Sequence, residues 1–502
     1  MVRKRRGTGG TGAHRETEER RAEVFGHAAI AIEGNHEGTK ARRSCSTRRT
    51  QPTSFLFVSV SPFLRVNPLP PSSPFARGIL IIVLGLNATA SPALHEITWT
   101  DLAPPMQSLL GARGIDHASF GAYVADVRRR DRERVRDGDL DHLMYYALQS
   151  SAFTNLPPIE PATSAKAFAQ HATIPPPVQD RFTALTSALR DRAHDARLSY
   201  FREIVERERA SGTPLPRLLS EQYARAMRSL YEKEFAATGD AYQRRGLSTD
   251  TSVEAGYVVY LGLAALHALE PDRRVRRVLV VGPGLDLAPR TGLVDVGDPQ
   301  SYQPFAIIDA LVGLGLADRA ALRVRALDIN PRVTDWMTRA HGTRPRLSLI
   351  SSIAERDGVR FTADYREYFA AVGRSVGVEQ RLARAAAGHL SKSIQLSAGV
   401  TDAIDATTAD IVVDRLDERF DLAIITNVFP YLSDRDLLLA ITNIVAMIAP
   451  GGVLLHNESR PLVAEASHAL GLPLLHSRSA VIATVEGAKS PLYDAVWLHR
   501  VP

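Results

Sequence analysis

The stretch that most constrains this chain is Val278–Pro289, which reads VLVVGPGLDLAP. Four apolar residues lead directly into Gly282-Pro283-Gly284, a pattern typical of a buried parallel strand that ends in a tight glycine turn. In an open α/β sheet such a turn lies at the carboxyl end of a strand, where ligands bind if the strand order reverses. Because glycine has no Cβ, its backbone approaches a ligand closely. The stretch therefore predicts a ligand-binding α/β domain.

From about residue 250 to the end, apolar strands alternate with helices. We expect strands at Val278–Val281, Arg323–Ile329, near Val400–Ile404, Phe420–Thr426 and Val453–Asn457, and helices at Phe305–Leu316, Val333–Ala340, Asp434–Ile448 and Leu462–Ala469. Two last strands, Ser479–Val485 and Tyr493–Val501, flank a turn and predict an antiparallel hairpin. The series is typical of βαβ units around a mostly parallel sheet.

Residues 93–250 have a different pattern, which predicts an α-helical domain. Apolar residues recur at spacings of three and four within 178–209 and 218–235, and shorter helices are expected at 120–136 and 140–148.

Two insertions interrupt the α/β pattern of residues 251–502. Residues 290–304 follow the glycine turn, at the predicted ligand-binding edge, where an insertion forms either a lid or a surface loop. Residues 361–396 look helical and either cover the site or mediate contacts.

The first 92 residues fit neither domain. Residues 1–76 are rich in Arg, Gly, Ser, Thr and Pro, which indicates a disordered or spuriously translated basic leader. Arg77–Ala90 combines a positive residue, a short apolar run and Ala-Thr-Ala, so residues 77–92 are interpreted as a possible signal peptide. The run is too short for a stable transmembrane helix, which needs about 20 apolar residues. A spurious leader predicts a cytoplasmic protein, whereas an active signal predicts export.

Charge and cysteine content exclude several kinds of partner and site. The chain has a net charge of +6, but residues 1–76 hold 13 Lys+Arg and 6 Asp+Glu, which leaves 48 and 49 for the rest. The folded part is thus nearly neutral, and we expect no nucleic-acid partner. The only cysteine, Cys45, lies in the leader. The body therefore has no cysteine nucleophile or thiolate ligand, and we predict no metal site.

Three further motifs follow the glycine turn. The strand RVRALDIN ends at Asp328, whose carboxylate at that place accepts hydrogen bonds from both hydroxyls of a ribose. Alternatively, Asp328 or Asn330 caps the helix after Pro331. FDLAIITNVFPY, residues 420–431, is a strand with Asn427 at its carboxyl end. In MIAPGGVLLHN, residues 447–457, a helix stops and turns into the next strand.

Taken in order, VLVVGPG, LDIN, FDLAIITNVFPYL and MIAPGGVLLHN resemble the class I S-adenosylmethionine-dependent methyltransferases. The resemblance covers about residues 251–502. It implies a Rossmann-like α/β fold, with a seven-stranded sheet and a C-terminal antiparallel hairpin, that transfers a methyl group from S-adenosylmethionine. It names neither the acceptor nor the oligomeric state. TNVFPYL is also similar, through Asn427 and Tyr431, to chemotaxis-receptor glutamate methyltransferases.

The resemblance assigns the methionine and ribose parts of the cofactor to two strand ends. Gly282 and Gly284 would wrap the methionine part, and Asp328, with the adjacent Ile329, would hold the ribose. Asp286 stands where the family usually has a third glycine, and either faces the cofactor's ammonium or caps the next helix. Both interpretations of Asp286 remain open.

The remaining cofactor contacts implied by the resemblance come from the third and fourth strands. Asp405, followed by Ala406, is taken to lie after the third strand and would meet the adenine amine. Asn427 and Phe429 would border the methyl group and the acceptor.

The sequence assigns no catalytic residue. Methyl transfer depends mainly on alignment and desolvation, and a base helps only a hydroxyl or amine acceptor. Tyr431, His456 and Glu458 lie where such a base would sit, although His456 is more simply a core residue of its strand.

Two rival functions remain. The first is a non-catalytic, possibly exported, binding protein on the same fold. The second is a nicotinamide-dependent oxidoreductase, which the long gap between Gly284 and Asp328 disfavours.

Overall fold

The computed structural model describes residues 93–191, 196–209, 212–236, 240–287, 293–382, 387–488 and 490–502. The predicted leader of residues 1–76 and the signal pattern of residues 77–92 lie outside these ranges. All described residues belong to one unit by their contacts. Within them, no helix combines the length and apolar character needed to cross a bilayer. The same residues contain no group of three or more His, Cys, Asp or Glu arranged to hold a metal ion.

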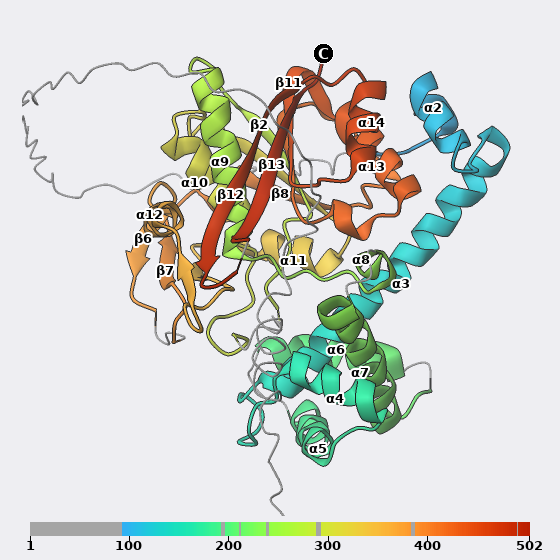
Figure 1. The fold of residues 1–502 in the computed structure, drawn as a ribbon, viewed down its shortest axis with the longest axis vertical. Helices are drawn as coiled ribbons and strands as arrows, with labels where there is room; N and C mark the ends of the chain where they lie inside the picture. Colours follow the sequence, from blue (N-terminus) through green and yellow to red (C-terminus); the bar gives the residue numbers. More distant parts are fainter. Residues whose placement is uncertain are drawn as a thin grey trace, which may run out of the picture. The chain divides into compact units, whose positions relative to one another are not determined.

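The centre of the fold is a mixed sheet of eight strands in the order β5-β12-β13-β11-β10-β2-β3-β8 (Figure 1). Five strands run parallel: β2 (Arg277–Val281), β3 (Arg323–Asp328), β8 (Ile404–Thr408), β10 (Phe420–Ile425) and β11 (Ile448–His456). The others pair antiparallel: β13 (Leu492–Arg500) with β11, β12 (Leu474–Val485) with β13, and β5 (Val359–Phe361) with β12. The sheet thus has one strand, β5, more than the seven predicted.

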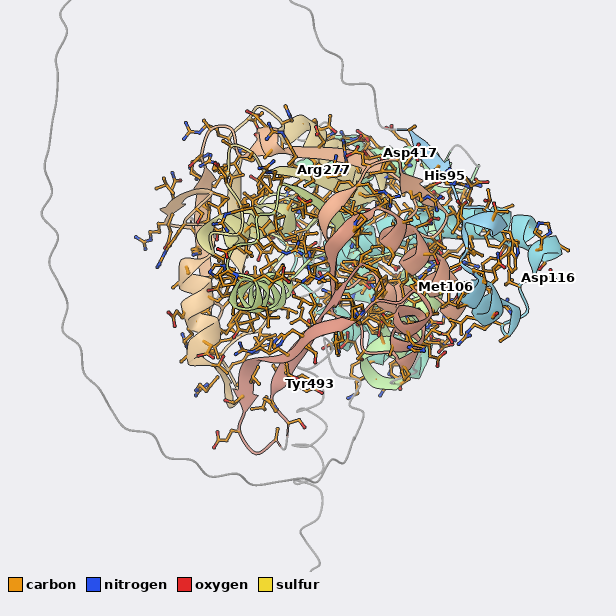
Figure 2. The ribbon with its side chains drawn as sticks, turned by 90° about the horizontal axis from the view of Figure 1, so that it is seen from above. His95, Met106, Asp116, Arg277, Asp417 and Tyr493 are labelled. Carbon is orange, nitrogen blue, oxygen red and sulfur yellow. The ribbon has the colours of Figure 1, made fainter. Side chains whose placement is uncertain are left out.

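The path of the chain through the sheet determines where a ligand binds. From β2 the chain passes outward to β3 and β8, and then returns to β10, which pairs with β2 on its other side. The strand order therefore reverses between β2 and β10. The carboxyl ends of strands at such a reversal are the usual ligand-binding place of open α/β sheets. Arg277 lies at the amino end of β2. Tyr493 lies near the start of the antiparallel strand β13, and so toward the carboxyl ends of the parallel strands. Figure 2 shows these two residues on opposite sides of the view.

Helices cover both faces of the sheet, so its parallel strands are apolar on both sides. Val278 and Val280 face a core formed with α9 (Val253–Leu269), α10 (Gln303–Gly313) and α12 (Ala363–Ala371). Leu279 and Val281, which alternate with them, face a second core formed with α13 (Asp434–Ala446) and α14 (Pro461–Ala469). Helix α11 (Pro331–Ala340) connects β3 to the segment that follows and packs into the first core.

The segment predicted to be a helical insertion at 361–396 contains one short helix together with strands, so that prediction was only partly right. It contains the end of β5, the short helix α12, β6 (Gly377–Gln380) and β7 (Ser391–Leu396). With β4 (Arg346–Ile350), the last two form a separate antiparallel sheet in the order β4-β7-β6. Such short strands contain few apolar residues. They are stabilised by pairing with strands elsewhere in the chain, so the local sequence shows little of the alternation that would predict a strand.

The helical part is built on α3 (His117–Gln149), a single helix that joins the two predicted at 120–136 and 140–148. The side chain of Asp116 caps α3 by accepting from the Ser119 amide at 2.9 Å. The second half of α3 packs in a third core with α4 (Pro161–His171), α5 (Pro176–Arg190), α6 (Ala196–Arg209) and α7 (Leu215–Tyr231). The helix predicted over 178–209 is thus two helices. A π-helical turn (Glu232–Ala236) and α8 (Ala241–Arg244) follow α7.

The packing divides the chain differently from the predicted boundary at residue 250. β1 (Leu94–Glu96) pairs with β9 (Asp414–Leu416), and α2 (Pro104–Gly111) packs into the core on the α13 face of the sheet. Phe120 and Val124 of α3 belong to that same core. The first half of α3 therefore packs against the α13 face of the sheet, and its second half packs in the helical core.

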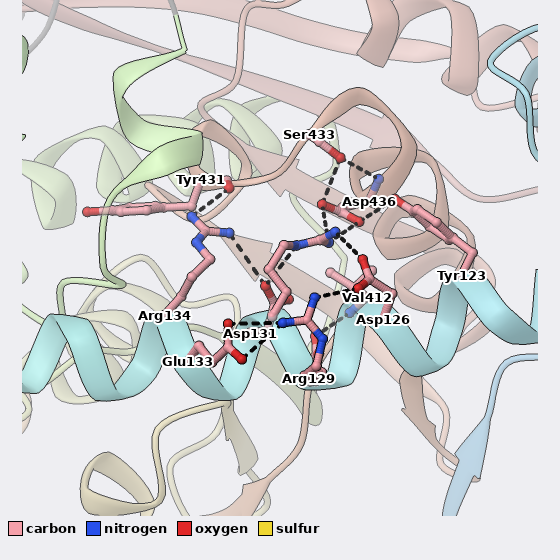
Figure 3. Close-up of polar contacts among 12 residues, drawn as sticks. Tyr123, Asp126, Arg129, Asp131, Glu133, Arg134, Val412, Tyr431, Ser433 and Asp436 are labelled. Carbon is pink, nitrogen blue, oxygen red and sulfur yellow. Dashed lines mark hydrogen bonds and ion pairs between the residues drawn. The ribbon is translucent and has the colours of Figure 1, made fainter. Parts of the chain in front are cut away.

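The middle of α3 carries a polar network that binds it to the strand ends (Figure 3). Arg130 forms two hydrogen bonds with the buried Asp436 at the start of α13, at 2.8 and 2.9 Å, and Tyr123 donates to the same carboxylate at 2.6 Å. Arg134 donates to the carbonyl of Tyr431 at 2.9 Å. These contacts attach the helical part to the turn that follows β10.

Candidate functional site

The glycine turn lies at the carboxyl end of β2 and has the backbone that glycine favours. Gly282 and Gly284 have φ angles of 66° and 72°. A Cβ on Gly284 would lie 2.0 Å from Thr251 Oγ1 and 2.4 Å from the carbonyl oxygen of Thr249. The segment before α9 therefore lies directly on the turn. Its Thr249 carbonyl oxygen also accepts a hydrogen bond from the Leu285 amide at 2.7 Å. No side chain larger than glycine fits at residue 284 without moving backbone.

Asp328 ends β3 beside this turn. One carboxylate oxygen accepts from the Gly284 amide at 3.4 Å and the other from the Asn330 amide at 2.8 Å. Asn330, not Asp328, caps α11 through the Arg332 amide. Burial raises the pKa of Asp328 to about 6, so the group is ionised at neutral pH. Each oxygen keeps a free lone pair for a ligand hydroxyl. Ile329 follows, partly exposed, in a bend.

Asp286 lies on the same turn, with its carboxylate accepting from the Thr251 amide at 2.9 Å. Burial and the neighbouring Asp250 raise the pKa of Asp286 to about 8. The next helix that the structure describes, α10, has Tyr302 at its N-cap position, so Asp286 does not cap it. At neutral pH Asp328 is therefore the ionised acid of this end of the site, whereas Asp286 mostly holds its proton until a cationic ligand favours the carboxylate.

The helical part reaches the side of this site where Asp328 lies. Asp139 of α3 is buried, and its Oδ1 accepts from Asn330 Nδ2 at 3.1 Å and from the Tyr200 hydroxyl at 2.8 Å. Arg332 lies over the Tyr200 ring, 4.3 Å from its centre, with its Nε 3.6 Å from Asp139 Oδ2. The second half of α3 therefore does more than pack within its own core, because Asp139, the residue just before the helix predicted at 140–148, contacts the residue that caps α11.

The insertion after the glycine turn is attached to the same helical part. Arg197 of α6 donates to the carbonyl oxygens of Leu287 and Gly297, and Ser150 Oγ donates to Asp295 at 2.7 Å. On its other side, the Gln300 side chain bonds the backbone of Ser348 in β4. The described part of the predicted insertion, residues 293–304, thus connects the helical part to the three-stranded sheet.

The structure corrects the predicted position of Asp405 and Ala406. Strand β8 runs four residues further than expected, and Thr408, not Asp405, lies opposite Asp328. Asp405 pairs with Arg325, three residues before the carboxyl edge, with 3.9 Å between their charged groups. The placement was wrong because IDATT has one large apolar residue and gives almost no strand signal.

The acid that does follow β8 is Asp410, and its carboxylate is used within the fold. Asp410 Oδ1 accepts from the Val412 amide at 3.0 Å, which stabilises the turn after the strand. Burial and the nearby Asp131 of α3 raise the pKa of Asp410 to about 8. Figure 3 shows this region, where α3 crosses the strand ends.

At the carboxyl ends of β10 and β11, two asparagines and an aspartate are joined. Asn427 has a φ of 60°, and its amide donates to Asn457 Oδ1 at 2.9 Å. Asn457 Nδ2 donates to Asn427 Oδ1 at 2.8 Å and to Asp494 Oδ2 at 3.1 Å. Gln303 Nε2 donates to Thr426 Oγ1 at 2.7 Å. We call Gln303, Thr426, Asn427, Asn457 and Asp494 the edge row.

Four members of the edge row, Gln303, Thr426, Asn457 and Asp494, were not found by sequence reasoning. Asp494 had a signal, because it alternates with the core residues Val496 and Leu498 and so is an acid at an inward position of β13. Asn457 closes the motif MIAPGGVLLHN, but its partners are 30 and 37 residues away. Gln303 has no local signal.

Phe429 and His456 lie on the opposite face of the sheet. Both are buried in or beside the α13-side core, with 5.9 Å between their ring centres. Burial and His499 lower the pKa of His456 to about 3, so the imidazole stays neutral. Glu458 forms an ion pair with Arg460 at 3.2 Å. His456 and Glu458 therefore form part of the packing, as expected for His456.

Tyr431 is held at the junction with the helical part. Its ring meets Tyr242 edge-on, with 5.4 Å between the ring centres, and the Arg245 guanidinium lies 5.8 Å from the Tyr431 ring centre. Together with Arg134 on its carbonyl, these contacts position the turn that follows Asn427.

Comparison with known proteins gave likenesses to solved structures only, since no family model and no curated protein matches the chain. The N-methyltransferase NodS from Bradyrhizobium japonicum, solved with S-adenosylhomocysteine, is 14% identical over 48% of this chain and 85% of its own, with a TM-score of 0.25. The magnesium protoporphyrin IX methyltransferase from Synechocystis, solved with S-adenosylmethionine, is 10% identical over 55% and 96%, with a TM-score of 0.25. An S-adenosylmethionine-dependent methyltransferase from Leishmania major is 12% identical over 54% and 84%, with a TM-score of 0.26.

These structural neighbours are S-adenosylmethionine-dependent methyltransferases, at low TM-scores. The local similarity to chemotaxis-receptor methyltransferases gains no support from them. The strand order and its reversal at β2, rather than these likenesses, define the fold of this chain.

Proposed function

We propose that the sheet domain is an S-adenosylmethionine-dependent methyltransferase and that the helical part covers its cofactor. One observation supports this above the others. At the reversal of strand order, the glycine turn after β2 donates a backbone amide to the carboxylate that ends β3. A glycine turn and an acid on neighbouring strands are the two elements that bind a nucleoside with a ribose.

The residues present fit this cofactor. Asp328 would hold the ribose hydroxyls, because its oxygens keep free lone pairs beside two backbone amides. Asp286 would face the ammonium of the methionine part, which in turn would favour the ionised carboxylate. When bound, S-adenosylmethionine supplies a methyl group on a positively charged sulfur, and a negative cradle suits that charge. It is the cofactor named for the Synechocystis methyltransferase.

The rest of the chain would exclude water and orient the acceptor. Two residues of the helical part contact the segments around the site. Asp139 contacts Asn330, which follows Asp328, and Arg197 contacts Leu287, which follows the glycine turn. The acceptor would approach from the ends of β10 and β11, where Asn427 is exposed. His456 remains neutral but is buried on the other face, so we assign it no proton transfer.

A calorimetric titration of the full chain with S-adenosylmethionine tests this proposal. We expect micromolar binding that is weakened at least tenfold by Asp328→Asn and unchanged by Asp405→Asn. The second variant removes the same charge at a position three residues from the edge. Absence of binding to a folded chain would reject the enzyme and favour the non-catalytic binding protein.

A further inference from the structure

The edge row lies on one face of the sheet. Ile424, Leu455 and Val496 all belong to the core under α9 and α10. Because side chains alternate along a strand, the residues two positions nearer the carboxyl edge lie on that face too. These residues are Thr426, Asn457 and Asp494. The row thus crosses the ends of β10, β11 and β13 on the side where α9 and α10 begin.

The hydrogen bonds of the row fix which atoms are available to a ligand. The backbone amide of Asn427 is a donor, so the Asn457 atom that it meets must be the oxygen. Asn457 Nδ2 is then directed at Asn427 Oδ1 and Asp494 Oδ2. Both of these oxygens retain a free lone pair. They flank one amide nitrogen and are therefore close together.

The row has further acceptor capacity at its buried end. Gln303 is buried, its Nε2 is bound to Thr426, and its Oε1 has no hydrogen-bond partner among the described residues. At the other end, Asp494 forms no ion pair with any described lysine, arginine or histidine. Its Oδ1 accepts only the Ala495 amide, at 2.7 Å. The row thus combines acceptor oxygens with an acid that has no cationic partner among the described residues, and burial raises the pKa of Asp494 above its ordinary value.

We propose that the edge row binds the methyl acceptor through an amine nitrogen. An ammonium offers three donors and a positive charge, which match the oxygens of Asn427 and Asp494. A hydroxyl offers one donor and no charge, and a carboxylate or phosphate would be repelled by Asp494. The inference rests on the proposed function, since it takes the neighbouring glycine turn to hold the methyl donor.

The test titrates the full chain with benzylamine, benzyl alcohol and benzoate by calorimetry, with and without saturating S-adenosylhomocysteine. We expect benzylamine to bind at least tenfold more tightly than benzyl alcohol, and benzoate not to bind. Asp494→Asn should lower benzylamine affinity at least tenfold and leave benzyl alcohol unchanged. Asp272→Asn is the matched control, because Asp272 is exposed before β2, at the opposite edge, and should change nothing.

Each alternative outcome overturns the inference. Equal binding of amine and alcohol, no amine binding, or unchanged amine binding in Asp494→Asn would each reject it. If Asp494→Asn does not fold, Asn457→Ala decides. That variant keeps the charge and removes the amide that orients Asn427, so it should weaken benzylamine several-fold, and no change would reject the inference. Failure of S-adenosylhomocysteine to bind rejects the proposed function separately, because the amine titrations are also read without it.

Discussion

The two ends of the same sheet edge are built in opposite ways. At the β2–β3 end, Asp328 is buried, and each of its oxygens accepts a backbone amide. At the β10–β13 end, Asn427 is exposed, and the edge row offers acceptor oxygens with free lone pairs. At the first end, hydrogen bonds to backbone amides hold the carboxylate in one position, which suits one fixed cofactor. The second end is exposed at Asn427 and buried at Gln303 and Thr426, and suits an acceptor that enters and leaves.

The difference follows from which elements cover each end. Asp139 and Arg197 hold the helical part against the residues around the glycine turn. The edge row instead lies where two asparagines and an aspartate bond only one another and local backbone. Changes at the first end should therefore alter stability and cofactor affinity together, whereas changes at the second should alter acceptor binding alone.

The largest effect is expected from Gly284→Ala. The added Cβ would lie 2.4 Å from the Thr249 carbonyl oxygen, which is backbone and cannot move without displacing the segment before α9. Left-handed strain and overpacking together should cost about 3 kcal/mol of unfolding free energy, and cofactor binding should become undetectable by calorimetry. Gly315→Ala is the control, since Gly315 has a φ of 73° and no atom within 4 Å of an added Cβ. If both variants lose the same stability, the close approach at Gly284 contributes nothing.

Asp328→Asn should weaken cofactor binding by about 2 kcal/mol, as expected for losing hydrogen bonds to a charged group. It should also change how stability depends on pH. The folded pKa of about 6 lies above the unfolded value of 3.8, so the folded state binds more protons between these values. Stability from this group is present below pH 4 and is lost as pH rises through 6, by about 3 kcal/mol in total.

Denaturant unfolding of the wild type and Asp328→Asn at pH 4 and pH 7 measures this difference. The wild type should lose stability relative to the variant as pH rises. A difference in unfolding free energy that does not change with pH would show that burial does not raise the pKa of Asp328.

Asp286 should give the cofactor end a second pH dependence, of smaller size. A cationic ligand selects the ionised carboxylate, and the free chain holds the proton up to about pH 8. Affinity should therefore rise by up to about tenfold per pH unit as pH approaches 8, since one pKa unit corresponds to about 1.4 kcal/mol. In Asp286→Asn, affinity should be about tenfold lower at pH 8 and nearly flat from pH 6.5 to 8. A wild-type profile that is already flat would remove Asp286 from the ammonium site.

The sequence predicted the cofactor end far better than the acceptor end, for a physical reason. The ends of β2 and β3 were predicted to within one residue, because buried parallel strands form continuous apolar runs. The contact of Gly284 with Asp328 follows from the order of those strands. Asp494 and Gln303 reach the site through pairings over 37 and 123 residues, which no local pattern records.

The smallest effect is expected at Asp405, where sequence and structure disagree. The sequence pattern assigns Asp405 to the adenine amine, which predicts a loss of affinity in Asp405→Asn. The structure places it opposite Arg325, with more than half of its side chain exposed, so its ion pair should contribute less than about 1 kcal/mol to stability. We expect cofactor affinity within twofold of wild type, measured in the same titration as Asp328→Asn. A tenfold loss would mean that β8 is shifted in register, because only a shift toward the carboxyl edge brings Asp405 to the cofactor.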